Sequence, residues 1–137
     1  MKKIFTLAVF IISCTTIKAQ PFMTYYSLEM ALESPNMVYK LNLQENDLKS
    51  LPESIGQLTN LKEMWLLGNS LTDLPESFGQ LTKLTKLDLR NNKFTIIPES
   101  IGELKNLTKL YLTGNRLTKS DINRIKKILP NCEIVFE

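Results

Sequence analysis

The sequence predicts an α/β repeat solenoid, and two observations support this prediction. Apolar, asparagine, proline and glycine positions recur at a constant step of 23 residues, and periods of roughly 20–50 residues are typical of solenoids. Within each repeat, apolar residues alternate with polar ones, as in Leu87-Asp88-Leu89, which indicates a strand with one buried face. A lone repeat would expose both of its flat sides, so the repeats must stack into one domain.

Each repeat contributes to columns of like residues. The two inward strand columns are Leu41, Met64, Leu87, Leu110 and Leu43, Leu66, Leu89, Leu112. An asparagine column follows, made of Asn46, Asn69, Asn92 and Asn115. Proline and glycine columns then mark a turn, with Pro52, Pro75, Pro98 and Gly56, Gly79, Gly102. Proline fixes φ and glycine permits a tight reversal, so these columns are turn chemistry.

The pattern L-x-x-L-x-L-x-x-N-x-L-x-x-L-P-x-x-I-G-x-L, from about Val38 to Phe136, resembles the leucine-rich repeat family in its 23-residue form. This resemblance implies a right-handed solenoid shaped as a short horseshoe. It implies a parallel sheet of about five strands on the concave side and short helical or extended turns on the convex side. It also implies that the concave sheet binds other molecules, most often proteins.

The asparagine column has a structural explanation. A buried asparagine can bond the backbone of the neighbouring turn, where no sheet ladder continues, and stacked asparagines then bridge one repeat to the next. We expect this role, rather than ligand binding, for Asn46, Asn69, Asn92 and Asn115.

Both ends of the solenoid are predicted to be capped. Tyr25–Glu33 places Leu28, Ala31 and Leu32 on one helical face, and Ser34-Pro35-Asn36 ends this helix. We therefore assign residues 20–37 to an N-terminal cap helix and 38–137 to the repeat domain with its C-terminal cap. We expect a complete solenoid rather than a piece of a longer array.

The C-terminal cap is predicted as a helix followed by a strand. Ser120 or Asp121 is expected to cap the helix. Its apolar residues recur at helical spacing: Ile122, Ile125, Ile128 and Leu129. The stretch Leu129–Ile134 then repeats the L-x-x-L-x-L frame, with Cys132 in the second leucine position. We expect this stretch to form a fifth, terminal strand.

Residues 1–19 are predicted to be a secretory signal peptide of bacterial type. Lys2 and Lys3 precede an apolar run, Ile4–Ile12, which is too short to span a bilayer, and cleavage is expected after Ala19. The protein would then be secreted or periplasmic. As an alternative, Ile11–Cys14 resembles a lipobox, in which a lipidated Cys14 would anchor the protein at the cell envelope. The length of the apolar run favours cleavage after Ala19.

The charge balance excludes two classes of partner. The formal net charge is +3, but Lys2, Lys3 and Lys18 lie in the signal segment, which leaves 17 − 3 = 14 basic residues against 14 acidic ones. No basic block suggests nucleic acid or an anionic membrane surface. Membrane association is expected only through Cys14.

The sequence shows no sign of catalysis. It has no histidine, which removes the commonest general base and metal ligand. Cys132 is the only cysteine beyond the signal, so it has no partner for zinc or a disulfide and is expected to be a small buried hydrophobe. No phosphate, dinucleotide or nucleophile motif occurs. The Pro-Glu-Ser triplets at 52–54, 75–77 and 98–100 are expected as solvent-facing turns. We predict no enzyme, no cofactor and no metal.

The outward strand positions form the candidate binding face. The three columns are Lys40, Glu63, Lys86, Lys109; then Asn42, Trp65, Asp88, Tyr111; then Gln44, Leu67, Arg90, Thr113. The terminal strand would add Asn131, Glu133 and Val135. The alternating charges of the first column could simply neutralise one another.

Trp65 and Tyr111 flank Asp88 in the second column, and aromatic residues with an arginine are typical of binding hot spots. Alternatively, Trp65 lies flat and only stiffens the sheet. The predicted partner-binding residues are Glu63, Trp65, Leu67, Lys86, Asp88, Arg90, Lys109 and Tyr111.

Two function classes follow from this face. The first is an exported, monomeric binding module that recognises a protein or peptide. The second is a surface structural or adhesive lipoprotein that acts through avidity. Replacing Trp65 separates the two, since only the first depends on one tight site.

Overall fold

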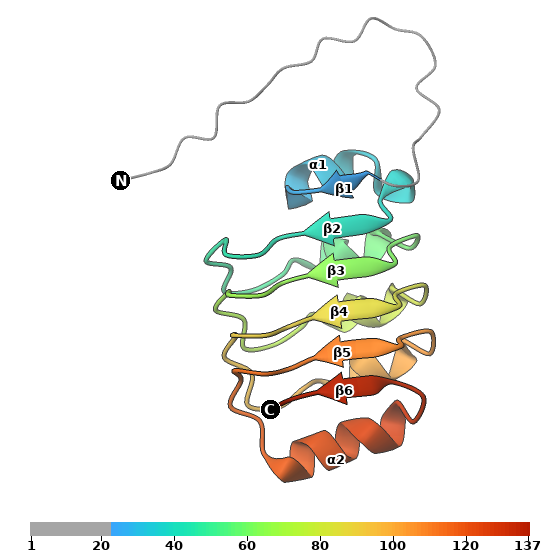
Figure 1. The fold of residues 1–137 in the computed structure, drawn as a ribbon. Coiled ribbons are helices and arrows are strands. Elements are labelled where there is room, and N and C mark those ends of the chain that lie inside the picture. The colour runs from blue at the N-terminus through green and yellow to red at the C-terminus, as the bar shows by residue number, and fades with distance from the viewer. Residues whose placement is uncertain (1–22) are drawn as a thin grey trace, which may run out of the picture.

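Six short parallel strands lie side by side in chain order and form one face of the solenoid (Figure 1). The computed structural model describes residues 23–137; the predicted signal peptide, its cleavage site after Ala19 and Cys14 lie outside these residues. The strands are β1 Thr24–Tyr25, β2 Lys40–Asn42, β3 Glu63–Trp65, β4 Lys86–Asp88, β5 Lys109–Tyr111 and β6 Glu133–Val135. The helices are α1 Leu28–Glu33 and α2 Lys119–Ile128, with 3-10 helices η1 Pro35–Met37, η2 Glu53–Gln57, η3 Glu76–Gln80 and η4 Glu99–Glu103. The predicted α/β solenoid is confirmed.

The inward strand positions build one continuous core. The central residues of β2 to β5 are Leu41, Met64, Leu87 and Leu110, and each is completely buried. Because successive side chains of a strand point to opposite faces, their neighbours point outward. The predicted strand frame is therefore correct for these four strands.

The proline column starts the 3-10 helices on the side opposite the sheet. Each of three five-residue 3-10 helices is preceded by a proline whose backbone is extended: Pro52, Pro75 and Pro98. Each helix buries one large apolar side chain, and its serine is half-buried against the neighbouring turn. The expectation that Ser77 and Ser100 face solvent is therefore wrong, because successive 3-10 helices stack closely.

The N-terminal cap contains a strand that the sequence did not predict. The helix was expected over Tyr25–Glu33, but it begins only after Ser27, whose side chain accepts a hydrogen bond from the Met30 amide. Thr24–Tyr25 instead pairs with β2. Without this pairing β2 would be an exposed edge strand with unpaired backbone groups. The helix ends at Glu33, as predicted.

The C-terminal helix is capped at least two residues earlier than predicted. Thr118, rather than Ser120 or Asp121, is the N-cap residue. Its hydroxyl accepts from the Asp121 amide at 3.2 Å, and the Asp121 carboxylate accepts from the Thr118 amide at 2.8 Å. This reciprocal pair is a capping box. Ile122 and Ile125 are buried against the last full repeat, and the Arg124 guanidinium donates to the Ile97 carbonyl.

The register of the terminal strand also differs from the prediction. Ile134, not Cys132, pairs with Leu110. A turn after α2, closed by the Cys132 amide donating to the Leu129 carbonyl, delays the strand by two residues. A shift of two keeps every side chain on its face. Glu133 and Val135 therefore still point outward, whereas Asn131 lies before the strand.

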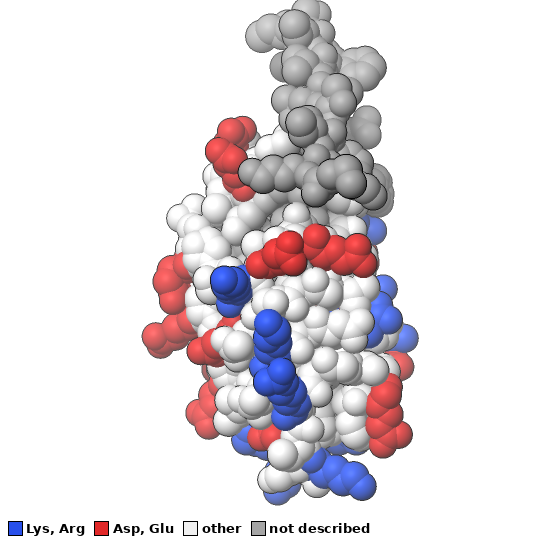
Figure 2. All heavy atoms as spheres, turned by 90° about the vertical axis from the view of Figure 1, so that its left-hand side faces the viewer, with Lys and Arg blue, Asp and Glu red and all other residues white. Residues whose placement is uncertain are grey.

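The turns after the strands form an edge with charges of both signs. Figure 2 shows this edge, toward which the arrowheads of Figure 1 point, with a row of basic side chains down its middle and acidic ones above and on both flanks. Glu45, Gly68, Asn91 and Gly114 occupy the same turn position and all have positive φ. A positive φ favours glycine, so Glu45 adopts this backbone conformation at a cost in free energy.

Candidate binding face

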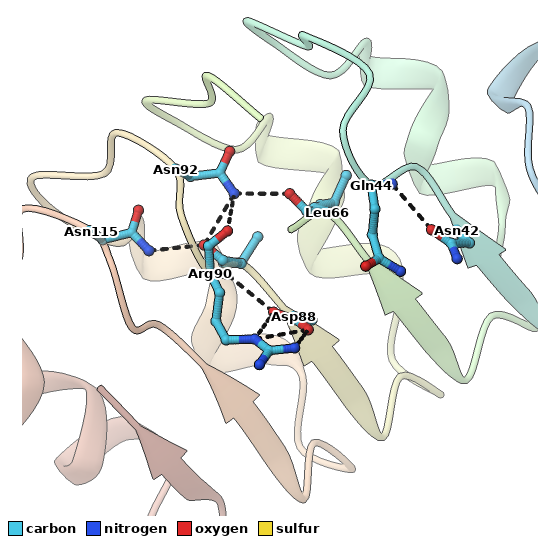
Figure 3. Close-up of polar contacts among 8 residues, drawn as sticks. Asn42, Gln44, Leu66, Asp88, Arg90, Asn92 and Asn115 are labelled. Atoms are coloured by element: carbon cyan, nitrogen blue, oxygen red, sulfur yellow. Dashed lines mark hydrogen bonds and ion pairs between the residues drawn. The ribbon is translucent and has the colours of Figure 1, made fainter. Parts of the chain in front are cut away.

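Three of the four column asparagines bridge neighbouring repeats. The Asn69 carbonyl oxygen accepts from the amides of Asn46 and Leu48, while its amide group donates to the carbonyls of Leu43 and Leu66. Asn92 and Asn115 bridge the following turns in a similar way, although each carbonyl oxygen accepts from one amide only. Figure 3 shows the bond that Asn92 donates to the Leu66 carbonyl.

Asn46 departs from the predicted ladder. It is exposed, and its side chain donates only to the Gln44 carbonyl of its own repeat. The reason is its position in the first repeat: the residues before β2 form a cap rather than another turn of this type.

The outward columns predicted from the sequence lie side by side in the sheet. Lys40, Glu63, Lys86 and Lys109 are register partners along β2 to β5, and Glu133 of β6 follows Lys109. The second column runs in the same way through Asn42, Trp65, Asp88 and Tyr111 to Val135. Neighbouring strands lie about 4.8 Å apart, so adjacent members of a column are in contact range.

The charges of the first column are only partly neutralised. Lys40 Nζ lies 2.8 Å from Glu63 Oε1, and Lys109 Nζ lies 3.1 Å from Glu133 Oε2. The hydrogen bond and charge of Glu133 raise the pKa of Lys109. Among the described residues, Lys86 forms no ion pair. Its Nζ lies instead 5.8 Å from the ring centroid of Trp65 and 5.7 Å from that of Tyr111, within the range of cation–π attraction.

Asp88 is buried under the Arg90 side chain rather than exposed to solvent. Its side chain is only 2% exposed, and Arg90 donates to both of its oxygens through Nε and Nη2, at 2.6–3.1 Å (Figure 3). The Arg90 amide adds a further bond to the same carboxylate. These bonds raise the pKa of Arg90, which stays charged. Asp88 was predicted to contact a partner; its burial instead makes it the residue that orients Arg90.

Trp65 and Leu67 are half-buried, so each presents part of its side chain on the sheet face. We define the β3–β5 cluster as Trp65, Lys86, Asp88, Arg90 and Tyr111. In this cluster Arg90 Cζ lies 5.2 Å from the Tyr111 centroid, so both cations stand over the same ring. Sequence reasoning found all five residues but missed the Asp88–Arg90 fork. The sequence feature that could have revealed this ion pair is the i, i+2 spacing of Asp88 and Arg90, which puts both side chains on one face of a strand.

The opposite side of the solenoid carries an acidic groove. Its volume is about 650 Å³, and its lining includes Glu53, Glu76, Glu99 and Glu103. Glu53 Oε2 accepts from the Ser77 amide at 3.0 Å and so links two repeats. Within residues 23–137, no group of three or more histidine, cysteine or acidic residues is arranged to hold a metal ion. No helix of that part of the chain is long and apolar enough to cross a bilayer.

Cys132 is expected to be a slow nucleophile. It is half-buried, and this burial is the main cause that raises the pKa of its thiol to about 11. At pH 8 only about one thiol in a thousand is then ionised, and the thiolate is the reactive form. In a Cys14→Ser chain, alkylation by iodoacetamide, followed by mass spectrometry, should be on the order of a hundredfold slower than for free cysteine. The rate should keep rising up to about pH 11; a plateau near pH 9 would contradict this.

Comparisons with known proteins agree with this architecture. A family model described as "Leucine-rich repeat region" matches residues 36–129. A search of curated proteins gives no match. Among solved structures, a leucine-rich repeat protein of Leptospira interrogans is similar, with a TM-score of 0.71 and 43% sequence identity over 73% of this chain. The match covers 26% of that protein's length. Domains of this type generally bind proteins and are generally not enzymes. The chain therefore belongs to the leucine-rich repeat family.

Proposed function

We propose that the protein is an exported binding module that recognises a protein or peptide partner through the outward face of β3 to β5. The observation that carries the proposal is the β3–β5 cluster. It combines one tryptophan, one tyrosine and one arginine at the centre of the sheet. These three residue types are enriched in binding hot spots.

The cluster is organised before any partner arrives. Asp88 holds the Arg90 guanidinium through three side-chain contacts, and both Arg90 and Lys86 stand over Tyr111. Side chains that are already fixed lose less conformational entropy on binding, which increases affinity. The strands around the cluster form a continuous parallel ladder, so the site stands on a rigid support.

Export is part of the proposal and is supported by the N-terminal sequence. Lys2 and Lys3, the apolar run Ile4–Ile12 and the small residue Ala19 are the three parts of a secretory signal. Mass spectrometry of the protein from its source organism should find Gln20 as the first residue. A mature chain that begins at a lipidated Cys14 would instead support anchoring at the cell envelope.

Replacing Trp65 tests the binding proposal. The immobilised chain is incubated with envelope extract and culture medium of the source organism, and the captured partner is identified and its affinity measured. Loss of a hot-spot side chain costs about 2 kcal/mol or more, so Trp65→Ala should weaken binding by about thirtyfold.

Ile96→Ala provides the matched control. Ile96 is 55% exposed and lies away from the sheet face, so its loss removes exposed apolar surface without touching the cluster. Circular dichroism would verify that both variants fold. Equal capture by both variants would contradict the proposal and favour an adhesive protein that acts through avidity.

A further inference from the structure

We infer that the β3–β5 cluster binds an acidic side chain, Asp or Glu, of its partner, held between the Lys86 ammonium and the outer edge of the Arg90 guanidinium. Trp65 and Tyr111 would pack against the residues that flank this acid. The inference rests on the proposed function, because it specifies the partner chemistry of the same face.

The first support is the charge left over on the face. Every other outward lysine in strands β2 to β5 has an acidic partner: Lys40 pairs with Glu63 and Lys109 with Glu133. Lys86 lies between these pairs in the register and has no such partner among the described residues. Since Asp88 and Arg90 carry opposite charges, the formal charge of the cluster is +1, and Lys86 is its source.

The second support is the unused donor edge of Arg90. A guanidinium has five N–H donors, and Asp88 occupies only Nε and one N–H of Nη2. Within residues 23–137 the Nη1 group makes no hydrogen bond, and the side chain is 43% exposed. Arg90 therefore presents donors to the outside while Asp88 fixes its plane. A second carboxylate is the acceptor that matches a guanidinium edge.

The third support is the aromatic surface around the two cations. The Tyr111 ring lies 5.7 Å from Lys86 Nζ and 5.2 Å from Arg90 Cζ, so both donor groups flank one ring. The Trp65 ring is the second aromatic neighbour of Lys86, with its centroid 5.8 Å from Nζ. Aromatic rings exclude water from part of the ammonium surface, and a charge pair is stronger where less water surrounds it. The same rings offer apolar surface to residues next to the acid.

The position of the cluster favours an internal side chain over a chain terminus. β2 continues the sheet on one side and β6 on the other, so the cluster lies in mid-sheet (Figure 1). Lys86 itself is partly exposed. An extended partner segment can therefore cross the cluster and continue in both directions.

A peptide selection tests the inference. The full chain is used to select from a displayed library of short random peptides that are fused at both ends and so lack a free carboxyl terminus. The expected result is enrichment of Asp or Glu next to an aromatic or aliphatic residue. A second library with free carboxyl termini shows whether a terminal carboxylate is preferred instead. A selected peptide and its Asn or Gln counterpart are then synthesised for affinity measurements.

The affinities of protein variants for the acidic peptide and for its neutral counterpart test whether Lys86 contacts the peptide acid. A hydrogen bond to a charged group contributes about 1.5–3 kcal/mol, so replacing the peptide acid should weaken binding to the unaltered chain by about tenfold or more. Lys86→Met should lose most of this preference, and Lys86→Arg should keep it. Lys49→Met is the matched control for net charge, since Lys49 is exposed and lies outside the sheet face; it should keep the preference in full.

Several results would overturn the inference. One is selection of peptides without an acid, or of acids only at free termini. Another is an acid preference that survives Lys86→Met or that Lys49→Met removes equally. In these cases the selected peptides can still depend on Trp65, and the proposed function stands. If no selected peptide depends on Trp65, the proposed function fails together with the inference.

Discussion

Replacing Asn69 with alanine is expected to lower the free energy of unfolding by about 3 kcal/mol. Asn69 is 7% exposed and makes four hydrogen bonds, which join two repeats. Alanine would leave the amides of Asn46 and Leu48 and the carbonyl of Leu43 without these partners. Buried groups that lose their partners cost more than the net value of the bonds. Urea denaturation followed by circular dichroism measures the change.

Asn46→Ala is the natural control for this prediction. Asn46 occupies the same column but is exposed and donates only to the Gln44 carbonyl. Its loss should change stability by less than about 0.5 kcal/mol, as is usual for surface substitutions. Equal effects at the two positions would show that the asparagines stabilise only their own turn rather than the junction between repeats.

The second large effect is expected at Gly56. A Cβ atom at this position would lie 2.7 Å from the Ser77 carbonyl oxygen, a backbone atom of the next 3-10 helix. Gly56→Ala therefore forces η2 and η3 apart. Overpacking of this kind typically costs about 1–3 kcal/mol, and we expect a value in the upper half of this range because a backbone must move.

The glycine column supplies its own graded controls. At Gly79 the nearest atom, the Ser100 carbonyl oxygen, would lie 3.2 Å from the new Cβ; at Gly102 the nearest is Ile128 Cδ1, at 3.7 Å. Gly79→Ala should therefore destabilise the protein less than Gly56→Ala. Gly102→Ala should be neutral or slightly stabilising, since alanine reduces the entropy of the unfolded chain. Thermal unfolding of the three variants should follow this order. Equal destabilisation by the three substitutions would contradict the idea that the close approach of successive 3-10 helices excludes a side chain at Gly56.

Most of the repeat and its sheet face could be predicted because both depend on local periodicity. The Leu-x-Leu alternation fixes which side of a strand Met64 and Leu66 occupy, and therefore where Trp65 and Leu67 point. Since each repeat has 23 residues, outward residues of successive strands fall beside one another, as Trp65 and Asp88 do. Neither conclusion required knowledge of a distant contact.

The ends of the solenoid were harder to predict because the repeat pattern stops there. β1 has only two residues and pairs with β2 because that edge is otherwise open. The register of β6 depends on how many residues the turn after α2 uses, and the L-x-x-L-x-L frame placed Cys132 where Ile134 lies. The pairing of β1 and the register of β6 depend on the surface of the solenoid that each segment covers. The spacing of residues within the segment does not encode that surface.

The sequence by itself determined the repeat period, the family, the inward and outward faces and the residues of the β3–β5 cluster. Only the tertiary structure decided how equal-looking positions differ. Asn46 and Asn69 share a column, as do Gly56 and Gly102, but each pair has different neighbours. Likewise, Asp88 is buried beneath Arg90, and Glu63 pairs with Lys40, which leaves its other neighbour Lys86 without an ion pair among residues 23–137. The repeat pattern specifies where a residue lies within its own repeat. Its contribution to stability also depends on the residues that it contacts in the neighbouring repeat.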